Sequence, residues 1–442
     1  MGGVTDLLNL RHHGASDLGH LVECRDCGLF QRVHTVADGD VAACVRCRRV
    51  LRRQHRNHPS LACAILAAML FVIALGSPLM TMHAAGRFVT GTLFTGPAIL
   101  DRLGKEEVGA LVLITLVAAP AVKLTILLSA LFGGAGTHSP RPPRWLAWLF
   151  GWFEIVSPWA MVEVFLLGVF VAYTRLRALA NVEIGPGLIA LGGVMLTMVA
   201  ADASLDRCAI WESLDPRGVG ARRETKQHGR LVGCHVCGLV AQAPEGSPCA
   251  RCRHGLHHRK RDSVARSWAL MLAAVALYVP ANLLPVMTVM RLEKGGSRTI
   301  IGGVVQLFDD HLWPLGIIVL LASIVVPVAK LCALTFMLVT TQRRSRSYLL
   351  GRTRLFRVIS VIGRWSMIDI FAVTTLVAMV RLGFLASVLP ENGVVFFAGV
   401  VVITMFATES FDPRLMWDAV QPRGFRAIPS ASHTSVATEE PA

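Results

Sequence analysis

Charged residues are scarce in this chain, and this restricts its class. Asp, Glu, Lys and Arg make up 17% of the 442 residues, whereas hydrophobic residues make up 53% and the mean hydropathy is +0.54. This composition excludes an ordinary soluble domain and indicates a polytopic membrane protein. Aromatic residues are also few, at 7%, and the 44 Lys and Arg outnumber the 29 Asp and Glu. We expect the positive charge to lie between apolar spans.

Two other features are missing from the sequence. It has no Walker A or other phosphate-cradling loop, so the chain has no evident ATPase of its own and is not expected to be an enzyme. No cleavable signal peptide precedes the first apolar run. The N-terminus is therefore expected to stay on the side of the membrane where the chain is made.

Eight apolar runs are present, each near or above the length that crosses a bilayer as a helix. They are Leu61–Met82, Val108–Gly133, Ile155–Thr174, Ile184–Ala201, Ser267–Met290, Leu312–Gln342, Trp365–Val380 and Asn392–Thr408. The loops on the side of the two termini hold 33 Lys and Arg, and the opposite loops hold 9. This bias predicts that both termini and the long central loop are cytoplasmic.

The chain also repeats itself after about 206 residues. The repeated motifs are Pro120-Ala-Val-Lys123-Leu124 with Pro327-Val-Ala-Lys330-Leu331, Trp159-Ala-Met161-Val-Glu163 with Trp365-Ser-Met367-Ile-Asp369, and Asp206…Trp211-Glu212 with Asp412…Trp417-Asp418. Four spans per unit give both units the same orientation, which predicts a parallel pseudo-two-fold repeat.

Between the first and second span of each unit the pattern changes to that of strands. Met287–Leu292 and Arg298–Ile301 flank a turn that contains Gly295 and Gly296, and Leu79–Phe94 is a weaker copy. We expect a small β-hairpin in each unit on the far side of the membrane.

Each unit is preceded by a cysteine quartet, spaced C-x2-C-x16-C-x2-C and C-x2-C-x11-C-x2-C. The quartets are Cys24, Cys27, Cys44 and Cys47, and Cys234, Cys237, Cys249 and Cys252. Two knuckles that supply four thiolates to a tetrahedral site are typical of a zinc ribbon, whose folding free energy comes from the metal. Rubredoxin-like iron also fits four thiolates. Disulfides are disfavoured in the reducing cytoplasm, and a structural role is favoured over a redox role.

Charged residues inside the spans form two related pairs. Lys123 and Lys330 lie in the second span of their units, and Glu163 and Asp369 lie in the third. A charge at membrane depth is costly unless it is paired or hydrated, so we expect each lysine to point inward at the carboxylate of its own unit. Such pairs either fix helix packing or belong to a substrate or proton pathway, and the sequence leaves both readings open.

Other features are given simpler interpretations. The basic runs before the first and fifth spans, Arg48–Arg56 and His257–Arg261, are interpreted as anchors to anionic headgroups, so no nucleic acid is expected as a partner. The segment from Ile428 to Ala442, rich in Ser, Thr, Ala and Pro, is expected to be disordered.

These motifs, in this order and twice over, resemble the paraquat-inducible protein A (PqiA/LetA) family over roughly residues 20–420. The second unit keeps the closing motif Phe411-Asp412-Pro413-Arg414 in full, whereas the first has Leu205-Asp206-Arg207-Cys208. The departure indicates that the two halves are not equivalent.

The resemblance implies a multi-pass protein of the bacterial inner membrane. It also implies a periplasmic MCE-domain protein as partner, membrane phospholipid or another lipophile as cargo, and support of envelope integrity. The alternative is a membrane redox or oxidant-sensing protein whose metal–thiolate ribbons pass electrons or sense oxidants.

The sequence therefore predicts an all-α polytopic fold of eight transmembrane helices in two parallel repeats. Each repeat follows a small cytoplasmic four-cysteine zinc ribbon and carries a short periplasmic hairpin. The expected parts are a tail (1–19), ribbon 1 (20–57), membrane unit 1 (58–206), a linker (207–229), ribbon 2 (230–258), membrane unit 2 (259–412) and a cytoplasmic tail (413–442).

Overall fold

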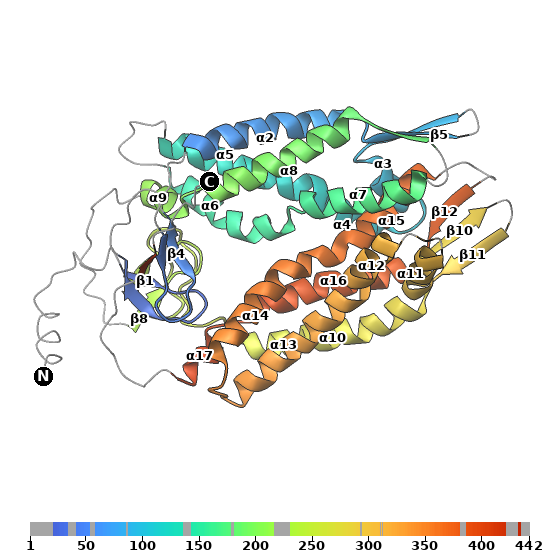
Figure 1. Ribbon diagram of the computed structural model, residues 1–442. Helices are drawn as coiled ribbons and strands as arrows, with labels where there is room; N and C mark the ends of the chain where they lie inside the picture. The colour runs from blue at the N-terminus through green and yellow to red at the C-terminus, as the bar shows by residue number, and fades with distance from the viewer. Residues whose placement is uncertain are drawn as a thin grey trace, which may run out of the picture.

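A computed structural model describes residues 21–33, 41–53, 58–84, 87–135, 143–177, 181–215, 230–291, 294–309, 311, 313–380, 386–420 and 432–434. Eight helical stretches among these residues are long and apolar enough to cross a membrane, which confirms the eight expected spans. They form two bundles that lie side by side, with the ribbons at one end and β-sheets at the other (Figure 1). We call these ends the ribbon end and the sheet end. The expected tail (1–19) and most of the expected linker lie outside the described residues.

Membrane unit 1 is built from seven helices and two short 3-10 or π segments. In chain order these are α2 (His58–Gly76), α3 (Thr95–Arg102), α4 (Glu106–Leu113), η2 (Ile114–Ala118), α5 (Ala119–Ala135), α6 (Arg144–Val156), η3 (Ser157–Trp159), α7 (Val162–Arg177) and α8 (Pro186–Ser204). The short helix α9 (Arg207–Ser213) follows, and the Asp206 carboxylate caps it by accepting from the Ala209 amide at 3.0 Å.

Membrane unit 2 repeats this order. Its elements are α10 (Ser263–Leu283), α11 (Ile300–Asp309), α12 (Trp313–Leu320), η4 (Leu321–Val325), α13 (Val326–Gln342), α14 (Leu349–Ile362), η5 (Gly363–Met367), α15 (Ile368–Met379), α16 (Asn392–Ser410) and α17 (Leu415–Asp418). In both units a π-helical turn ends two residues before the intramembrane proline, Pro120 or Pro327, and local widening of this kind accommodates the missing proline N–H within a continuous helix.

The third span of each unit is broken by a 3-10 turn that includes the tryptophan of the W-x-M motif. It also begins earlier than expected, at Trp145 in unit 1 and Leu349 in unit 2. The first span of each unit ends earlier than expected, at Gly76 and Leu283, because the residues after Pro78 and Pro285 belong to strands.

The sheet end confirms the hairpins and adds a third strand to each. In unit 1, β5 (Met80–Ala84) pairs with β6 (Arg87–Gly91) and β7 (Asn181–Ile184); in unit 2, β10 (Met287–Arg291) pairs with β11 (Lys294–Arg298) and β12 (Ala386–Pro390). The third strand comes from the loop between the third and fourth spans. Two details differ from expectation: Gly295 and Gly296 lie within β11, and Ile300 begins α11.

Each ribbon is a pair of small hairpins or knuckles. Ribbon 1 contains β1 (Leu21–Glu23), β2 (Phe30–Arg32), β3 (Val41–Ala43) and β4 (Val50–Arg53), and ribbon 2 contains β8 (Arg230–Gly233) and β9 (Val240–Ala243). Within the tail that was expected to be disordered, Ser432–Thr434 forms β13, which pairs with β3.

The two membrane units meet along their third spans. Phe165 of α7 and Phe371 of α15 make an edge-to-face contact with ring centroids 5.5 Å apart. Gly168 permits the close approach, because a Cβ there would lie 2.7 Å from the Phe371 Cβ. Most of the buried apolar side chains of both units belong to one continuous core around this contact.

Candidate functional site

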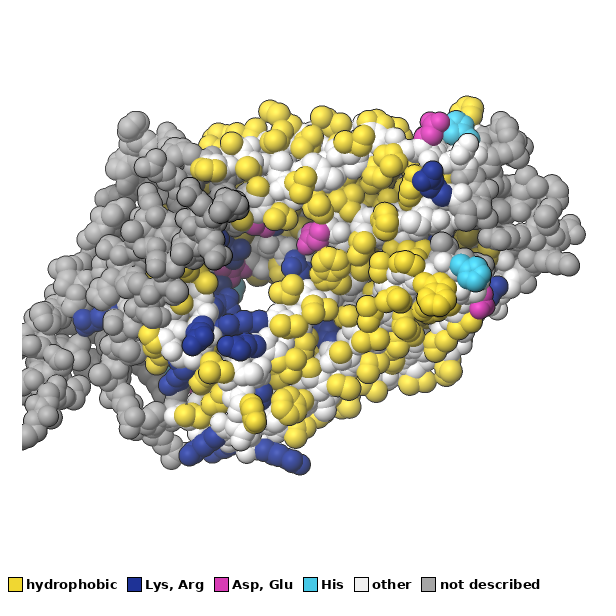
Figure 2. Space-filling view, viewed as in Figure 1, with side chains coloured by type: hydrophobic (Ala, Val, Ile, Leu, Met, Phe, Trp, Pro, Cys, Tyr) yellow, Lys and Arg dark blue, Asp and Glu magenta, His cyan; other side chains and the backbone are white. Residues whose placement is uncertain are grey.

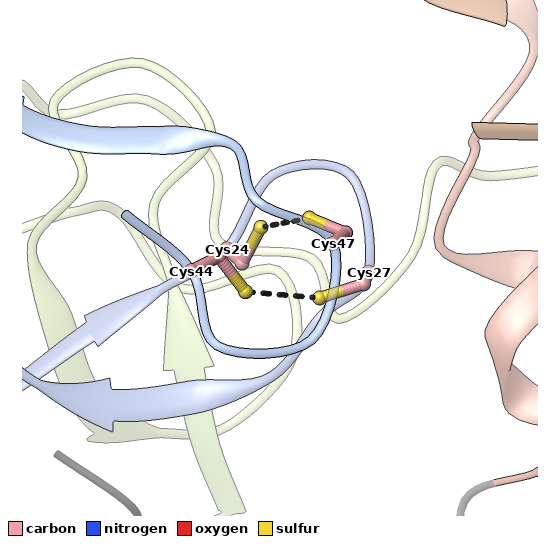
Figure 3. A group of neighbouring side chains, drawn as sticks. All are labelled: Cys24, Cys27, Cys44 and Cys47. Carbon is pink, nitrogen blue, oxygen red and sulfur yellow. Dashed lines mark hydrogen bonds between the residues drawn. The ribbon is translucent and has the colours of Figure 1, made fainter. Parts of the chain in front are cut away.

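The four cysteines of ribbon 1 converge on one point (Figure 3). All four are buried, and the Sγ atoms of Cys24 and Cys47 lie 3.4 Å apart, while those of Cys27 and Cys44 lie 3.6 Å apart. Gly28 has φ +66°, and its amide donates to the Cys24 carbonyl at 2.8 Å. This left-handed residue closes the tight turn that brings both cysteines of a knuckle to the same side.

Ribbon 2 repeats this geometry. Cys234 and Cys252 have their Sγ atoms 3.5 Å apart, those of Cys237 and Cys249 are 3.6 Å apart, and Gly238 has φ +72°. In both quartets all four Sγ atoms lie within 4.8 Å of one another.

The donor sets fit a metal ion. Sulfurs at the corners of a tetrahedron with metal–sulfur bonds of about 2.3 Å lie about 3.8 Å apart, close to the observed spacings. A disulfide needs sulfurs about 2.05 Å apart, so the quartets as placed are not disulfides. Zinc and iron both accept four thiolates, and this geometry does not choose between them.

A guanidinium from membrane unit 2 reaches the ribbon 1 centre. Arg357 of α14 donates to the Cys47 Sγ at 3.3 Å, to the Cys47 carbonyl at 3.0 Å and to the Asp26 carboxylate at 2.6 Å. Asp26 also pairs with Arg49. Such contacts to a liganding sulfur orient it and offset the negative charge of a four-thiolate centre.

The two ribbons and unit 2 meet at a buried ionic cluster. Arg414, which is 2% exposed, donates to Glu23 of ribbon 1 at 2.9 Å and to both oxygens of Asp412 at 2.9 and 3.0 Å. Glu23 in turn accepts from the Gly233 amide of ribbon 2 at 2.9 Å. Burial raises the pKa of Glu23, an effect that Arg414 opposes; burial and then Arg414 lower the pKa of the adjacent His235 to about 4. The imidazole is therefore neutral at pH 7.

A cavity of about 500 Å³ lies beneath this cluster, between the two membrane units. Figure 2 shows a hollow in this region, bordered by Lys and Arg side chains. Its basic lining residues are Arg25, Arg49, Lys260, Lys330, Arg364 and Arg414, its acidic ones Asp26, Glu154, Glu409 and Asp412, and its apolar ones include Ile155, Phe356, Ile359, Met405 and Phe411. The lining is thus amphipathic with more cationic than anionic groups.

Lys330 is almost fully buried, with 3% of its surface exposed. Its Nζ donates to the Thr404 hydroxyl at 3.2 Å. Gly363 makes room for it, because a Cβ on that glycine would lie 2.8 Å from the Nζ. Glu409 lines the same cavity.

Lys123, the counterpart of Lys330, has a different environment. Its Nζ lies 2.5 Å from the Asp202 carboxylate, and not against Glu163 as expected. Glu163 instead faces Arg364 of the other unit, with Glu163 Oε1 and Arg364 Nη1 3.5 Å apart. The expected pairing within unit 1 is wrong because the fourth span supplies a nearer carboxylate than the third.

Asp369 does not pair with Lys330 either. It accepts from the Ser323 hydroxyl of the π-turn η4, and it lines a small apolar pocket towards the sheet end together with Arg175 and Arg298. Lys330 and Asp369 therefore line different cavities, the first next to the ribbons and the second next to the strands of the sheet end.

Sequence reasoning missed several residues of this site. Asp202 follows directly after Ala201, where the expected fourth span ends, and Glu409 occupies the same place after the eighth. Scanning one residue further would have identified both. Ser323 and Gly363 carry no signal of their own, since a serine or glycine in an apolar run is common.

Comparison with known proteins agrees with this architecture. The family model described as paraquat-inducible protein A matches the chain twice, at residues 58–215 and 264–421, and the two matches confirm the internal repeat. A duplicated multi-pass membrane protein with a four-cysteine centre before each repeat is the class that the structure defines. The chain belongs to the paraquat-inducible protein A (PqiA) family.

Relatives of known name cover nearly the whole chain. The intermembrane transport protein PqiA of Escherichia coli K12 is 30% identical, over 92% of this chain and 97% of the relative. The lipophilic envelope-spanning tunnel protein A of the same organism is 27% identical, over 91% and 92%. The probable intermembrane transport protein of Haemophilus influenzae is 24% identical, over 90% and 95%. No solved structure matches the chain significantly.

Proposed function

We propose that this protein is a non-enzymatic subunit of an intermembrane lipid transport system in the bacterial inner membrane. Relatives named as intermembrane transport proteins and as a lipophilic envelope-spanning tunnel protein support transport of a lipophile. The amphipathic cavity between the units suits such cargo, because basic side chains attract a phosphate-bearing headgroup while apolar ones border the bilayer interior.

The observation that carries this proposal is the different state of two equivalent lysines. Lys123 is held by Asp202, whereas Lys330 lines the cavity and has only a hydroxyl as its hydrogen-bond partner among the described residues. A buried ammonium without a close carboxylate is costly, and such groups at membrane depth mark pathways for substrates or protons. We therefore assign the working cavity to unit 2.

Asp369 is the second group of this pathway. It lies towards the sheet end, where it lines an apolar pocket, so Lys330 and Asp369 occur at successive depths of the same unit. Lys330 attracts the headgroup and Asp369 exchanges a proton or contacts the cargo beyond it. Lys123 and Glu163 then serve helix packing.

The transport proposal also includes a topology and a partner. The ribbons and both termini lie in the cytoplasm, and the β-sheets face the periplasm. An MCE-domain protein receives the phospholipid there and carries it towards the outer membrane in support of envelope integrity.

Both four-cysteine centres hold structural Zn²⁺. Metal analysis of the purified protein tests this, because two iron–thiolate centres absorb visible light and would favour the redox alternative.

The transport proposal is tested by Lys330→Met with Lys123→Met as its matched control. Each variant is tested for its ability to complement a deletion strain under envelope stress, and its amount in the membrane is measured by immunoblot. We expect Lys330→Met to be inserted at normal levels without function. Lys123→Met should retain function but lose about 1–3 kcal/mol of stability, because Asp202 loses its partner. Full complementation by Lys330→Met would remove Lys330 from the pathway.

A further inference from the structure

Each ribbon packs on the membrane unit that it does not directly precede in the chain. Specific contacts must therefore direct each ribbon to the correct unit. The cysteines of ribbon 1 pack in one apolar cluster with membrane unit 2, including Leu334, Met337 and Trp417. The cysteines of ribbon 2 pack in another cluster with membrane unit 1, including Phe150, Phe153 and Trp211. Each ribbon thus precedes one unit in the chain and covers the other.

Ribbon 1 meets unit 2 through a charged contact. Asp26, the residue before Cys27, is 1% exposed and accepts from Arg357 of α14 at 2.6 Å. A cation–ring contact also supports the docking, since the Arg46 guanidinium lies 5.4 Å from the centre of the Trp417 ring.

Ribbon 2 meets unit 1 through an apolar contact at the equivalent positions. In the repeat, Val236 before Cys237 corresponds to Asp26, and Gly151 of α6 corresponds to Arg357, both placed by the cysteine and tryptophan motifs. A Cβ on Gly151 would lie 3.2 Å from a Val236 methyl group, so the glycine allows the valine to approach the helix.

The mismatched arrangement would be unfavourable for both ribbons. Asp26 against Gly151 would bury a carboxylate with no guanidinium from the helix, and Val236 against Arg357 would leave that guanidinium with no carboxylate. We propose that two contacts, Asp26–Arg357 and Val236–Gly151, direct each ribbon to the membrane unit that it does not precede in the chain. The partner of each docking surface is therefore a ribbon of the same chain.

This recognition has a mechanical consequence. Because each ribbon is joined in sequence to one unit and packed on the other, the two ribbons together hold the ribbon ends of the units against each other. They also place Arg25, Asp26 and Arg49 over the cavity that contains Lys330. This docking of the ribbons does not depend on what the cavity carries.

The test replaces the charged contact of ribbon 1, Asp26–Arg357, by the Val–Gly pair that ribbon 2 uses at the equivalent positions. Full-length Arg357→Gly, Asp26→Val and the Asp26→Val/Arg357→Gly double variant are compared with wild type in mild detergent. Arg354→Gly is the matched control, since it puts a glycine at an exposed position of the same helix. N-ethylmaleimide and a metal chelator are added, and the alkylation rate of each cysteine is measured by peptide mass spectrometry.

Each single variant should raise the alkylation rates of the ribbon 1 cysteines by about tenfold or more, the usual effect of losing a contact around a metal centre. The ribbon 2 cysteines in the same sample should keep their wild-type rates. The double variant should return the ribbon 1 rates most of the way to wild type. The proposal is overturned if Arg357→Gly behaves like Arg354→Gly, if both ribbons react faster together, or if the double variant reacts as fast as the single ones.

Discussion

Single small residues decide how the two lysines behave. Gly363 lies against the Lys330 Nζ, and the equivalent residue of unit 1 is Ser157. A side chain at residue 363 would take the space in which the ammonium sits. Lys123 is paired with a carboxylate, whereas Lys330 faces the cavity. This difference thus depends on the missing Cβ of Gly363 as well as on the neighbouring carboxylates.

We predict that Gly363→Ser reduces transport by on the order of tenfold or more, because small displacements of a working group cost that much. The protein should still fold, since the clash is with the flexible end of a lysine. Complementation of a deletion strain, normalised to membrane abundance, measures the effect. Ser157→Gly in unit 1 is the control and should leave transport unchanged. Normal transport by Gly363→Ser would show that the position of the ammonium is not critical.

Short segments between the helices position several of the residues that matter for the site. The 3-10 turns in the third spans present Gly363 and Ser157, and the short segment before α17 presents Arg414 to the ribbons. Unit 1 has Cys208 at the place of Arg414, so only one of the two closing motifs supplies this guanidinium. The departure between the two motifs therefore has a structural reason.

We predict that Arg414→Met lowers the free energy of unfolding by about 3–5 kcal/mol, because it removes the buried cation that Glu23 and Asp412 share and leaves Glu23 only Arg259, 3.7 Å away. Thermal denaturation in detergent, followed by loss of the monodisperse peak, measures this. Arg261→Met is the control, since the Arg261 side chain is 84% exposed. Equal stability of the two variants would contradict a role for the cluster in holding the ribbons.

The two membrane units are held together by close packing between their third spans. The contact at Gly168 and Phe371 brings α7 and α15 together at the centre of the core, and the cavity and the sheet-end pocket lie on either side of it along the bundle. A larger side chain there must separate the units, because packed interiors leave little free volume.

Gly168→Val should therefore destabilise the protein by about 1–3 kcal/mol through overpacking. The control is Gly192→Val on α8, where an added Cβ has no neighbour within 4 Å, so both variants carry the same helix-propensity change. The difference between their melting temperatures isolates the contact between units. If the two variants melt together, the α7–α15 contact is looser than described.

The spans, the repeat and the quartets were predictable from the sequence. Hydropathy over about 20 residues determines what crosses a bilayer, and the C-x2-C spacing fixes a knuckle by local geometry alone. The hairpins were also predictable, because their two strands are neighbours in the chain. Each of these features depends on residues close together in sequence.

Pairings between distant segments were decided only by the tertiary structure. Unit 1 offers Lys123 two carboxylates, Glu163 and Asp202, and each ribbon has two units on which it could pack, so local sequence pattern could not tell which of these contacts would form. The third strands β7 and β12 join their sheets across about 100 residues of chain, and such contacts leave no periodic signal. The membrane spans, the duplication and the thiolate centres follow from local sequence patterns. Packing of the two halves determines which lysine faces the cavity, because burial and charge balance depend on neighbours that only folding brings together.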